Sequence, residues 1–476
     1  MNEPDLLQLA SYVAGDPIES EDRLDVFNPY DGQLVGTVTR ATPEDAERAM
    51  QAAVASSSQL SRYQRSEILL RTREALIEES ESIAKLIMRE SGLCLRDTRY
   101  EVGRGSDVLQ FAAMEALHDD GQIFSCDVSP QGKQRKIFTT REPVGLALAI
   151  TPFNHPLNQV VHKLAPAVAA GVPTILKPPR RTPLTAIRLV ELLYQSGLPA
   201  EMLSVLVGDN ATVIEPMISD PRVELVSFTG STGVGKKIAA LAGYKKTCLE
   251  LGGNSPLIIL EDADMELAVQ LAAEGCYRNS GQRCTAVKRL LVHDDVLAEF
   301  TARLVEKSAE YTCGDPADEA TRVGTVIDEQ AAQELETVVQ LATDAGARVL
   351  HGGKRNGAQI EPTVIADVPR DCQMVVEESF GPLAPILAVR DLDDAIELAN
   401  ATAFGLSSGI VTRDIDQAID AVKRIRSGTV NINEVPGYRI ECSPFGGIKD
   451  SGLGVKEGVI EAMKFLTNVK TFSLPW

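Results

Sequence analysis

The sequence predicts an α/β protein with two series of alternating strands and helices and a small protruding β hairpin. Short apolar segments alternate with amphipathic segments over residues 144–242, and the same pattern starts again after Gly253. Between Gly121 and Pro143 the chain is polar and interrupted by proline and glycine, which predicts an extended hairpin. Because 476 residues are too many for one ordinary core, more than one domain is expected.

The chain is acidic, with a formal charge of −20, while its hydrophobic share of 44% and its charged share of 24% are ordinary for a globular enzyme. An acidic surface repels phosphate backbones, so we expect no nucleic acid partner. An anionic small molecule would need a local cluster of Arg or Lys that opposes this overall field.

The eight cysteines are scattered, with no C-x-x-C pair and no zinc-ligand spacing, so we expect free thiols and no metal site. The N-terminus has no recognisable signal peptide, and the longest apolar stretches are far short of a membrane span. We therefore expect a cytoplasmic protein that does not contact a membrane.

Helices are expected from Thr42 to about Leu117, where apolar positions recur every three and four residues. The first series then predicts strands at VGLALAI, PTILK, MLSVLVG and VELVSFTG, and helices around residues 158–170 and 185–195 and at GVGKKIAAL. The second series predicts strands at SPLIIL, RLLVHD, PTVIAD, PLAPILAV, SSGIVT and GTVNIN. The tail, FLTNVKTFSLPW, is strand-like and is predicted to pair with the hairpin or with another subunit.

Two segments contain candidate catalytic residues. In NSGQRCTAVKR, Cys284 follows Arg283, and a neighbouring cation lowers the pKa of a thiol. In LELGGNSP, Glu250 ends an apolar strand before a glycine turn, where a carboxylate faces the crevice of an α/β sheet and can act as a general base. Taken singly, Cys284 could be a buried structural thiol and Glu250 a solvated carboxylate.

Two further segments suggest binding groups. In SFTGSTGVGKK a strand runs into Gly230, Ser231 and Gly235 at the start of a helix, where backbone N–H groups can approach a phosphate, although a plain turn would read the same way. In ITPFNHPLN, the amide of Asn154 could stabilise an oxyanion or could simply cap the following helix.

Together these segments resemble the aldehyde dehydrogenase superfamily over nearly the whole chain. The shared motifs stand in the family's order, and the spacing of 34 residues between Glu250 and Cys284 is the family's usual one; the motifs are PFNHP (152–156), ILKP (175–178), FTGSTGVG (228–235), LELGG (249–253), GQRC (281–284), EESFGP (377–382) and PFGGIKDSG (444–452). The resemblance implies an aldehyde dehydrogenase-like fold with a Rossmann-type NAD(P)-binding domain (1–120 and 142–249), a catalytic domain (250–440) and an oligomerisation segment (121–141 and 456–476). It also implies a homodimer or homotetramer.

The resemblance assigns catalytic roles to three residues. Cys284 is the expected nucleophile, Asn154 the oxyanion donor together with the Cys284 N–H, and Glu250 the base that activates water against the thioester. Some superfamily members transfer the acyl group to coenzyme A and lack this glutamate, so Glu250 indicates water as the acceptor.

The expected cofactor is NAD or NADP. The resemblance places Lys177 at the adenosine ribose, Gly230, Ser231 and Gly235 at the pyrophosphate, and Glu378 and Phe380 at the nicotinamide. Many NAD-preferring members carry Glu where this chain has Arg180, and Arg accepts the 2′-phosphate that Glu repels, so NADP is tolerated in principle. Alternatively, Arg180 and Arg181 only cover the first turn of the next helix.

Four residues are predicted to bind the substrate, since the resemblance brings Arg104, His155, Arg283 and Arg439 to the substrate entrance. Three guanidinium groups and an imidazole would form an anion site; alone, each Arg could be a surface ion pair. Within the superfamily, the NH pair at 154–155, GYR at 437–439 and the ending SLPW resemble phosphonoacetaldehyde dehydrogenases.

The expected substrate is thus a short anionic aldehyde, and phosphonoacetaldehyde is the specific prediction. Non-phosphorylating glyceraldehyde-3-phosphate dehydrogenases, which usually have Tyr after the oxyanion Asn, and lactaldehyde or sulfolactaldehyde dehydrogenases remain alternatives. A catalytically silent structural relative is the alternative from another class, against which the intact Cys284, Glu250, Asn154 and Lys177 argue.

Overall fold

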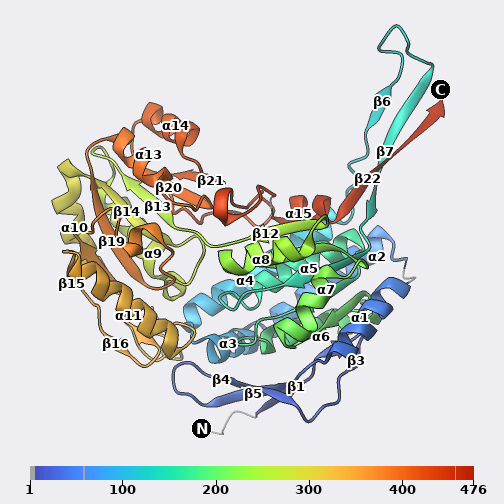
Figure 1. Cartoon of the computed structure of the whole chain (residues 1–476), viewed down its shortest axis with the longest axis horizontal. Helices are drawn as coiled ribbons and strands as arrows, with labels where there is room; N and C mark the ends of the chain where they lie inside the picture. Colours follow the sequence, from blue (N-terminus) through green and yellow to red (C-terminus); the bar gives the residue numbers. More distant parts are fainter. Residues whose placement is uncertain (1–5, 57–58, 456) are drawn as a thin grey trace.

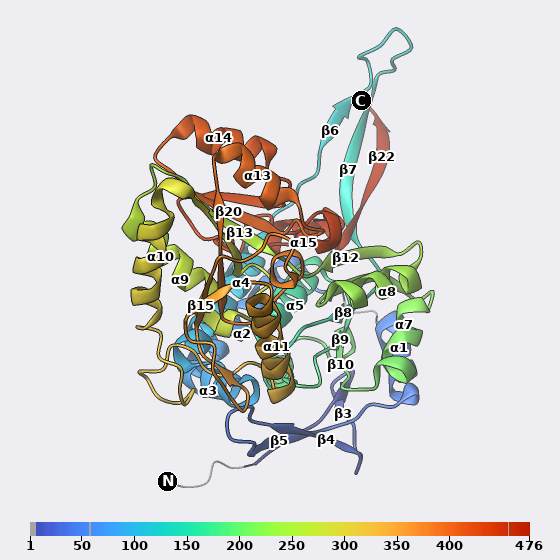
Figure 2. The same ribbon diagram turned by 60° about the vertical axis from the view of Figure 1, so that its left-hand side comes forward.

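The computed structural model describes residues 6–56, 59–455 and 457–476. Two α/β units lie side by side, and a β arm stands away from them (Figures 1 and 2). No helix within these described ranges is long and apolar enough to cross a membrane.

The first unit begins with short strands before Thr42, which were not predicted from the sequence, and continues with the helices predicted from Thr42 to Leu117. A small sheet has the strand order β1-β5-β4, with β1 at Leu7–Leu9, β4 at Arg23–Phe27 and β5 at Leu34–Thr39. The region from Thr42 to Leu117 forms four helices, α1 (Pro43–Ala55), α2 (Arg62–Glu78), α3 (Ser80–Ser91) and α4 (Leu95–Glu115). Capping boxes at Thr42 and Ser61 start α1 and α2.

A seven-stranded sheet forms the centre of this unit, in the order β12-β11-β8-β9-β10-β2-β3. The five strands β8 to β12 are parallel, and β2 and β3 add an antiparallel edge. The strands are β2 (Tyr12–Val13), β3 (Asp16–Pro17), β8 (Leu146–Ile150), β9 (Thr174–Lys177), β10 (Leu203–Val205), β11 (Val223–Thr229) and β12 (Lys246–Glu250).

Helices cover both faces of this sheet. One core lies against α2 to α6 and another against α1, α7 and α8. Every residue of β8 is buried, because a parallel strand between two helical layers has no solvent face. The helices that follow the strands are α5 (Asn158–Ala170), α6 (Leu184–Gln195), α7 (Glu215–Ser219) and α8 (Thr232–Ala242).

The second unit has its own seven-stranded sheet, in the order β15-β18-β19-β14-β13-β20-β21. All neighbours are parallel except β15. The six predicted strands are β13 (Ser255–Ile259), β14 (Val287–His293), β18 (Thr363–Ala366), β19 (Leu383–Val389), β20 (Ser407–Val411) and β21 (Thr429–Ile432), and β15 (Arg348–His351) joins their edge. The helices are α9 (Met265–Tyr277), α10 (Asp294–Ser308), α11 (Glu329–Asp344), α12 (Gln373–Val376), α13 (Leu392–Asn400) and α14 (Ile415–Arg424); β16 (Arg355–Asn356) and β17 (Gln359–Ile360) form a separate small hairpin. Helix α15 (Val459–Phe465) follows in the chain but packs against α4 and α5 of the first unit.

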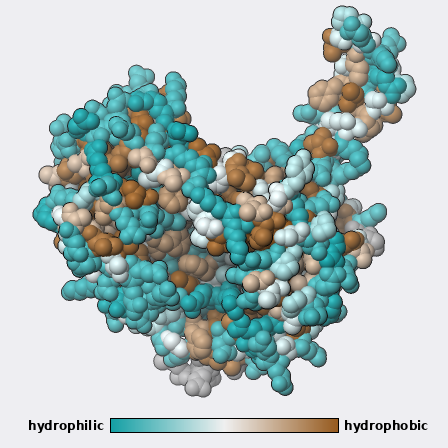
Figure 3. Space-filling view, viewed as in Figure 1, coloured by the Kyte–Doolittle hydropathy of each residue, from teal (hydrophilic) through white to brown (hydrophobic). Residues whose placement is uncertain are grey.

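The protruding arm is a three-stranded sheet in the order β22-β7-β6. It joins β6 (Ile123–Ser125) and β7 (Arg135–Pro143) to β22 (Thr467–Pro475). The tail pairs antiparallel with β7 from Thr467 opposite Pro143 to Pro475 opposite Arg135, so of the two predicted pairings the one with the hairpin is present. Apolar side chains show on the arm in Figure 3.

Candidate active site

The loop that carries Cys284 has an unusual backbone. Asn279, Ser280 and Gly281 follow α9 and all have positive φ, at 59°, 52° and 69°. A non-glycine residue in this region costs of order 1–3 kcal/mol and persists only where its surroundings hold it. Asp97 supplies part of that hold, because its Oδ2 accepts a hydrogen bond of 2.7 Å from the Asn279 backbone N–H.

The glycine pair after β12 brings Glu250 next to this loop. A Cβ on Gly253 would lie 2.2 Å from the Cys284 carbonyl oxygen, so only glycine permits this approach. The Gly253 N–H also donates to Glu378 Oε1 at 3.1 Å. The buried end of β12, the Cys284 loop and Glu378 therefore meet at one place, where the first sheet ends and the second begins.

Arg283 lowers the pKa of Cys284, as expected of a neighbouring cation, but other effects outweigh it. Burial raises the pKa of Cys284 to about 12, and the charges of Glu378 and Glu250 add to this rise. Arg439 and Arg283 act in the opposite direction but do not compensate. The thiol is therefore protonated at neutral pH, since the low-dielectric surroundings disfavour the thiolate more than two cations favour it.

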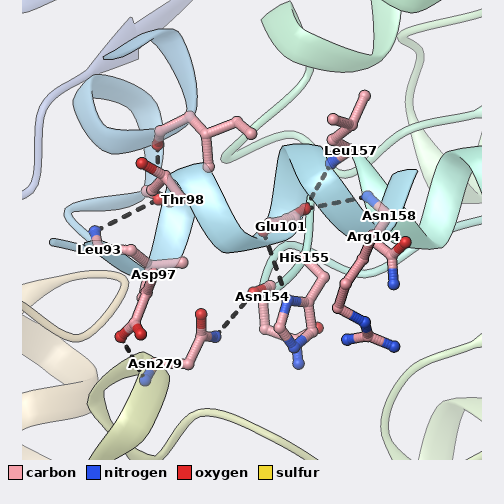
Figure 4. Close-up of polar contacts among 12 residues, drawn as sticks. Leu93, Asp97, Thr98, Glu101, Arg104, Asn154, His155, Leu157, Asn158 and Asn279 are labelled. Carbon is pink, nitrogen blue, oxygen red and sulfur yellow. Dashed lines mark hydrogen bonds and ion pairs between the residues drawn. The ribbon is translucent and has the colours of Figure 1, made fainter. Parts of the chain in front are cut away.

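Asn154 lies beside the same loop, between β8 and α5. Its Nδ2 donates to the Gln282 backbone carbonyl at 2.8 Å, and the backbone carbonyl of Asn154 accepts from Asn279 Nδ2 at 3.0 Å. One amide hydrogen of Asn154 thus holds the loop, and the other is available to an oxyanion. The helix-capping alternative does not apply, because Glu101 Oε1 accepts from the two backbone N–H groups at the start of α5 (Figure 4).

The four predicted substrate residues lie together. Arg104, His155, Arg283 and Arg439 all line one cavity of about 280 Å³, and Cys284 lies in its wall. Four carboxylates share this cavity, but each already has a contact within the chain: Asp97 with Asn279 and Arg278, Glu101 with α5 and His155, Glu274 with Arg278, and Glu434 with the Val435 N–H. These four carboxylates therefore stabilise the walls of the cavity through contacts within the chain.

Arg283 carries positive charge that no carboxylate neutralises directly. Within the described part of the chain no acidic group lies within 4.0 Å of it, and its Nη2 donates instead to the Glu274 and Gly275 carbonyls at 3.2 and 2.9 Å. Burial, followed by repulsion from Arg278, lowers the pKa of Arg283 to about 10. A partly buried cation in this state would be stabilised by a bound anion.

Arg104 and Arg439 are arranged around one buried carboxylate, Glu441. Arg104 Nε donates to Glu441 Oε1, and Arg439 lies 4.0 Å from Oε2. Burial alone would raise the pKa of Glu441, but the hydrogen bond from His162 and the charges of both arginines hold it well below its usual range. Glu441 is bound through Nε, and the two terminal nitrogens of Arg104 donate to no other described residue, so they are available for a ligand.

The predicted cofactor residues lie along the carboxyl edge of the first sheet. Strand register places Lys177 opposite Ile150, Ile150 opposite Phe228, and Thr229 opposite Glu250. This edge is where dinucleotides bind in open α/β sheets. Lys177 is buried, and burial together with Arg180 lowers its pKa to about 8.

Several polar groups along this edge fit a nicotinamide dinucleotide. The buried hydroxyls of Thr151 and Thr229 have no hydrogen-bond partner among the described residues, and the Ser231 side chain makes no capping bond at the start of α8. Gly230 precedes that helix. Close packing explains why glycine stands at position 235, since a Cβ there would lie 2.3 Å from the Leu251 side chain. Arg180 is exposed near Lys177.

The two residues predicted at the nicotinamide line a different cavity from the four anion-site candidates. Glu378 and Phe380 line a second cavity, of about 690 Å³, with Phe153 and Gln282. Burial raises the pKa of Glu378, while the nearby charge of Lys288 lowers it.

Three residues that organise the site were missed in the sequence. Asp97 and Glu101 had a detectable signal, because residues 97, 101 and 104 are spaced to share one face of a helix. Glu441 had none, since its contact with Arg104 spans 337 positions in the chain.

Comparisons with known proteins identify the class of enzyme. The sequence profile described as "Aldehyde dehydrogenase family" matches residues 17–472. A 3-sulfolactaldehyde dehydrogenase from Priestia aryabhattai is 36% identical over 468 residues, which cover 98% of both chains.

Solved structures agree with this match. Aldehyde dehydrogenase 21 from Physcomitrella patens, in complex with the reaction product succinate, superposes with a TM-score of 0.96 at 35% identity over 99% of both chains. The glyceraldehyde-3-phosphate dehydrogenase GapN from Methanocaldococcus jannaschii, complexed with NADP, has a TM-score of 0.92 at 34% identity and covers 96% of this chain and 100% of its own. The chain belongs to the aldehyde dehydrogenase family. It is an NAD(P)-dependent oxidoreductase with the aldehyde dehydrogenase fold.

Proposed function

We propose that this enzyme oxidises a short aldehyde with an anionic group to its carboxylate through a thioester on Cys284. The Cys284 thiol loses its proton to solvent as its sulfur attacks the aldehyde carbon, and the Asn154 amide with the Cys284 N–H stabilises the oxyanion that forms. The nicotinamide cofactor supplies the hydride acceptor. Glu250 then takes a proton from the water that hydrolyses the thioester. One aldehyde, one water and one NAD(P)+ give one carboxylate, one NAD(P)H and two protons.

The observation that carries the anion specificity is the state of Arg283. It adjoins the nucleophile, lines the same cavity as Arg104, His155 and Arg439, and has no carboxylate within ion-pair distance among the described residues. A cation kept without a counter-ion inside a protein is costly, so an anionic ligand is the natural partner. Its place beside Cys284 favours a charge only a few bonds from the aldehyde carbon.

The specific substrate we propose is phosphonoacetaldehyde, whose two carbons place a dianion beside the carbonyl. A sulfonated aldehyde is the second candidate, because a 36% identical relative is named a 3-sulfolactaldehyde dehydrogenase. Both groups are tetrahedral oxyanions that a guanidinium group can bind through two oxygens.

We propose that both NAD and NADP are accepted. Arg180 stands near Lys177 at the adenosine end of the predicted site, and a guanidinium group there would tolerate a 2′-phosphate. Comparing kcat/KM for the two cofactors in the wild type and in Arg180→Glu tests this, since the variant should discriminate against NADP.

The substrate proposal is tested by comparing kcat/KM for phosphonoacetaldehyde, sulfoacetaldehyde, glyceraldehyde 3-phosphate and neutral propanal. The wild type should prefer an anionic aldehyde. In Arg283→Ala and Arg104→Ala the KM for the anionic aldehyde should rise about 10- to 100-fold, the cost of a lost charge-assisted contact, with little change for propanal. Arg348→Ala is the matched control, because Arg348 lies on β15 and forms an exposed ion pair with Asp367. This variant should change the KM of neither the anionic aldehyde nor propanal.

Two outcomes would contradict the proposal. Equal losses on charged and neutral aldehydes would mean that the arginines act structurally. If the wild type and Cys284→Ser were equally inactive with every aldehyde and both cofactors, the chain would be a catalytically silent family member.

A further inference from the structure

Helix α4 presents three charged side chains to the site from one face. Asp97, Glu101 and Arg104 are four and three residues apart, so they follow one another along the helix surface. Figure 4 shows Asp97 directed at Asn279, Glu101 at the start of α5, and Arg104 beyond it. One rigid element thus touches the nucleophile loop, the Asn154 loop and the anion cavity.

Glu101 makes the densest set of contacts of the three. Its side chain is 2% exposed, and its Oε1 accepts from the N–H groups of Leu157 and Asn158 at 2.8 and 2.9 Å. Its Oε2 lies 3.4 Å from His155 Nδ1. Oε1 thus anchors Glu101 to the start of α5, and Oε2 is left to face His155.

This contact determines which nitrogen of His155 carries the proton. An ionised carboxylate only accepts hydrogen bonds, so Nδ1 of His155 must hold a hydrogen. In a neutral ring, Nε2 is then a bare acceptor, and it points away from Glu101 in Figure 4. Because His155 lines the anion cavity, an anion there would face a lone pair unless the ring gains a second proton.

The surroundings of His155 keep the ring neutral in the free protein. Burial lowers the pKa of His155, Glu101 opposes that effect, and the charges of Arg104 and Arg283 add to the lowering. The other charged groups that line the same cavity are Asp97, Glu274, Arg278, Glu434 and Arg439. A bound anion adds a negative charge on the Nε2 side, so the doubly protonated ring becomes favourable between two negative groups.

We infer that Glu101 is a positioning residue that makes anion binding proton-linked: it holds Nδ1–H of His155, so that an anion in the cavity is bound by the imidazolium with uptake of one proton. This inference rests on the proposed function, because it requires that His155 meets the anionic group of the substrate. The linkage has a definite sign. Binding is tightest at low pH and weakens as pH rises from the lowered pKa of the free ring to the raised pKa of the complex.

The test uses ethanesulfonate, whose charge stays constant between pH 6 and 9, as a competitive inhibitor against propanal. For the wild type, the inhibition constant should rise up to about tenfold per pH unit in part of this range, as one proton per anion requires. In Glu101→Gln the amide oxygen still accepts from Leu157 and Asn158, but the amide N–H donates to Nδ1 and moves the ring proton to Nε2. The inhibition constant should then vary less than about twofold with pH, while kcat/KM for propanal stays within about threefold.

His155→Asn is the second variant, and it keeps the Glu101 contacts with α5. It should also lose the pH dependence, which keeps the test informative if Glu101→Gln lowers Tm. A slope that persists in both variants would overturn the inference, as would a flat profile in a wild type that still prefers anionic aldehydes. A wild type without any anionic preference would instead overturn the proposed function.

Discussion

The reactivity of Cys284 is set by opposing effects around a single sulfur atom. Burial and the carboxylates of Glu378 and Glu250 favour the thiol, while Arg283 and Arg439 favour the thiolate. The balance lies on the thiol side, so the free protein protects its nucleophile, and an added positive charge near the sulfur would shift that balance.

Alkylation of Cys284 by iodoacetamide should therefore accelerate about tenfold per pH unit from pH 7 to 10, because the thiolate fraction grows tenfold per unit below a pKa of about 12. Mass spectrometry of the modified peptide measures this rate separately from the other cysteines.

Glu378→Gln removes the larger of the two carboxylate effects and should speed alkylation several-fold at pH 8. Arg348→Ala serves again as the distant control. A rate that levels off below pH 9 would show that Cys284 is more acidic than its surroundings imply.

At the scale of elements, the site depends on three close approaches between segments distant in the chain. The β12–β13 turn touches the nucleophile loop through Gly253, α4 touches the same loop through Asp97, and α4 reaches α5 through Glu101. Each approach uses a backbone group, so its geometry is shared by all the side chains that the loop carries.

Gly253→Ala should therefore lower kcat/KM for every aldehyde by roughly 100-fold, since a displacement of the Cys284 loop by about 1 Å has an effect of that size. The physical cause is the 2.2 Å separation between the added Cβ and the Cys284 carbonyl oxygen. Steady-state kinetics and Tm should both be measured.

Gly103→Ala is the matched control for this change. Gly103 lies within α4 with no atom within 4 Å of an added Cβ, so alanine should preserve activity and stabilise the helix by up to about 1 kcal/mol. If Gly253→Ala retained wild-type kinetics, the close approach would not constrain the loop.

At the scale of the whole molecule, the β arm exposes apolar side chains that the chain itself does not cover. One row across the three strands holds Ile123, Phe138 and Phe472. The rings of Phe138 and Phe472 stack with their centroids 5.3 Å apart. Ile123 and Phe472 are 63% and 43% exposed. Such a row on an extended sheet favours burial against a second copy of the chain, which agrees with the homodimer or homotetramer expected from the sequence.

Phe472→Asp should lower the molecular mass measured by light scattering, because a carboxylate in that apolar row opposes burial. Val128→Asp, at an 82% exposed position in the connection between β6 and β7, is the control and should leave the mass unchanged. A monomeric wild type, or an unchanged mass in Phe472→Asp, would contradict an interface on this row.

The two series of strands and helices and the order of the motifs followed from local patterns, whereas the short strands before Thr42 did not. The helix expected at residues 158–170 is α5, and the ten strand segments named outside the arm and its partner tail are strands β8 to β11, β13, β14 and β18 to β21. These features depend on hydrophobic spacing within a few turns or residues, which the sequence displays directly.

Only the tertiary structure decided the partners and charge states of the site. The sequence alone identified Cys284, Glu250, Asn154 and the four anion-site candidates, and it indicated the pKa-lowering effect of Arg283 but not the larger opposing effect of burial. It also left Glu101 and Glu441 unnoticed, although they hold His155 and Arg104. The physical reason is that the pKa and the partner of a side chain depend on burial and on charges nearby in space, which come from segments that the fold alone brings together.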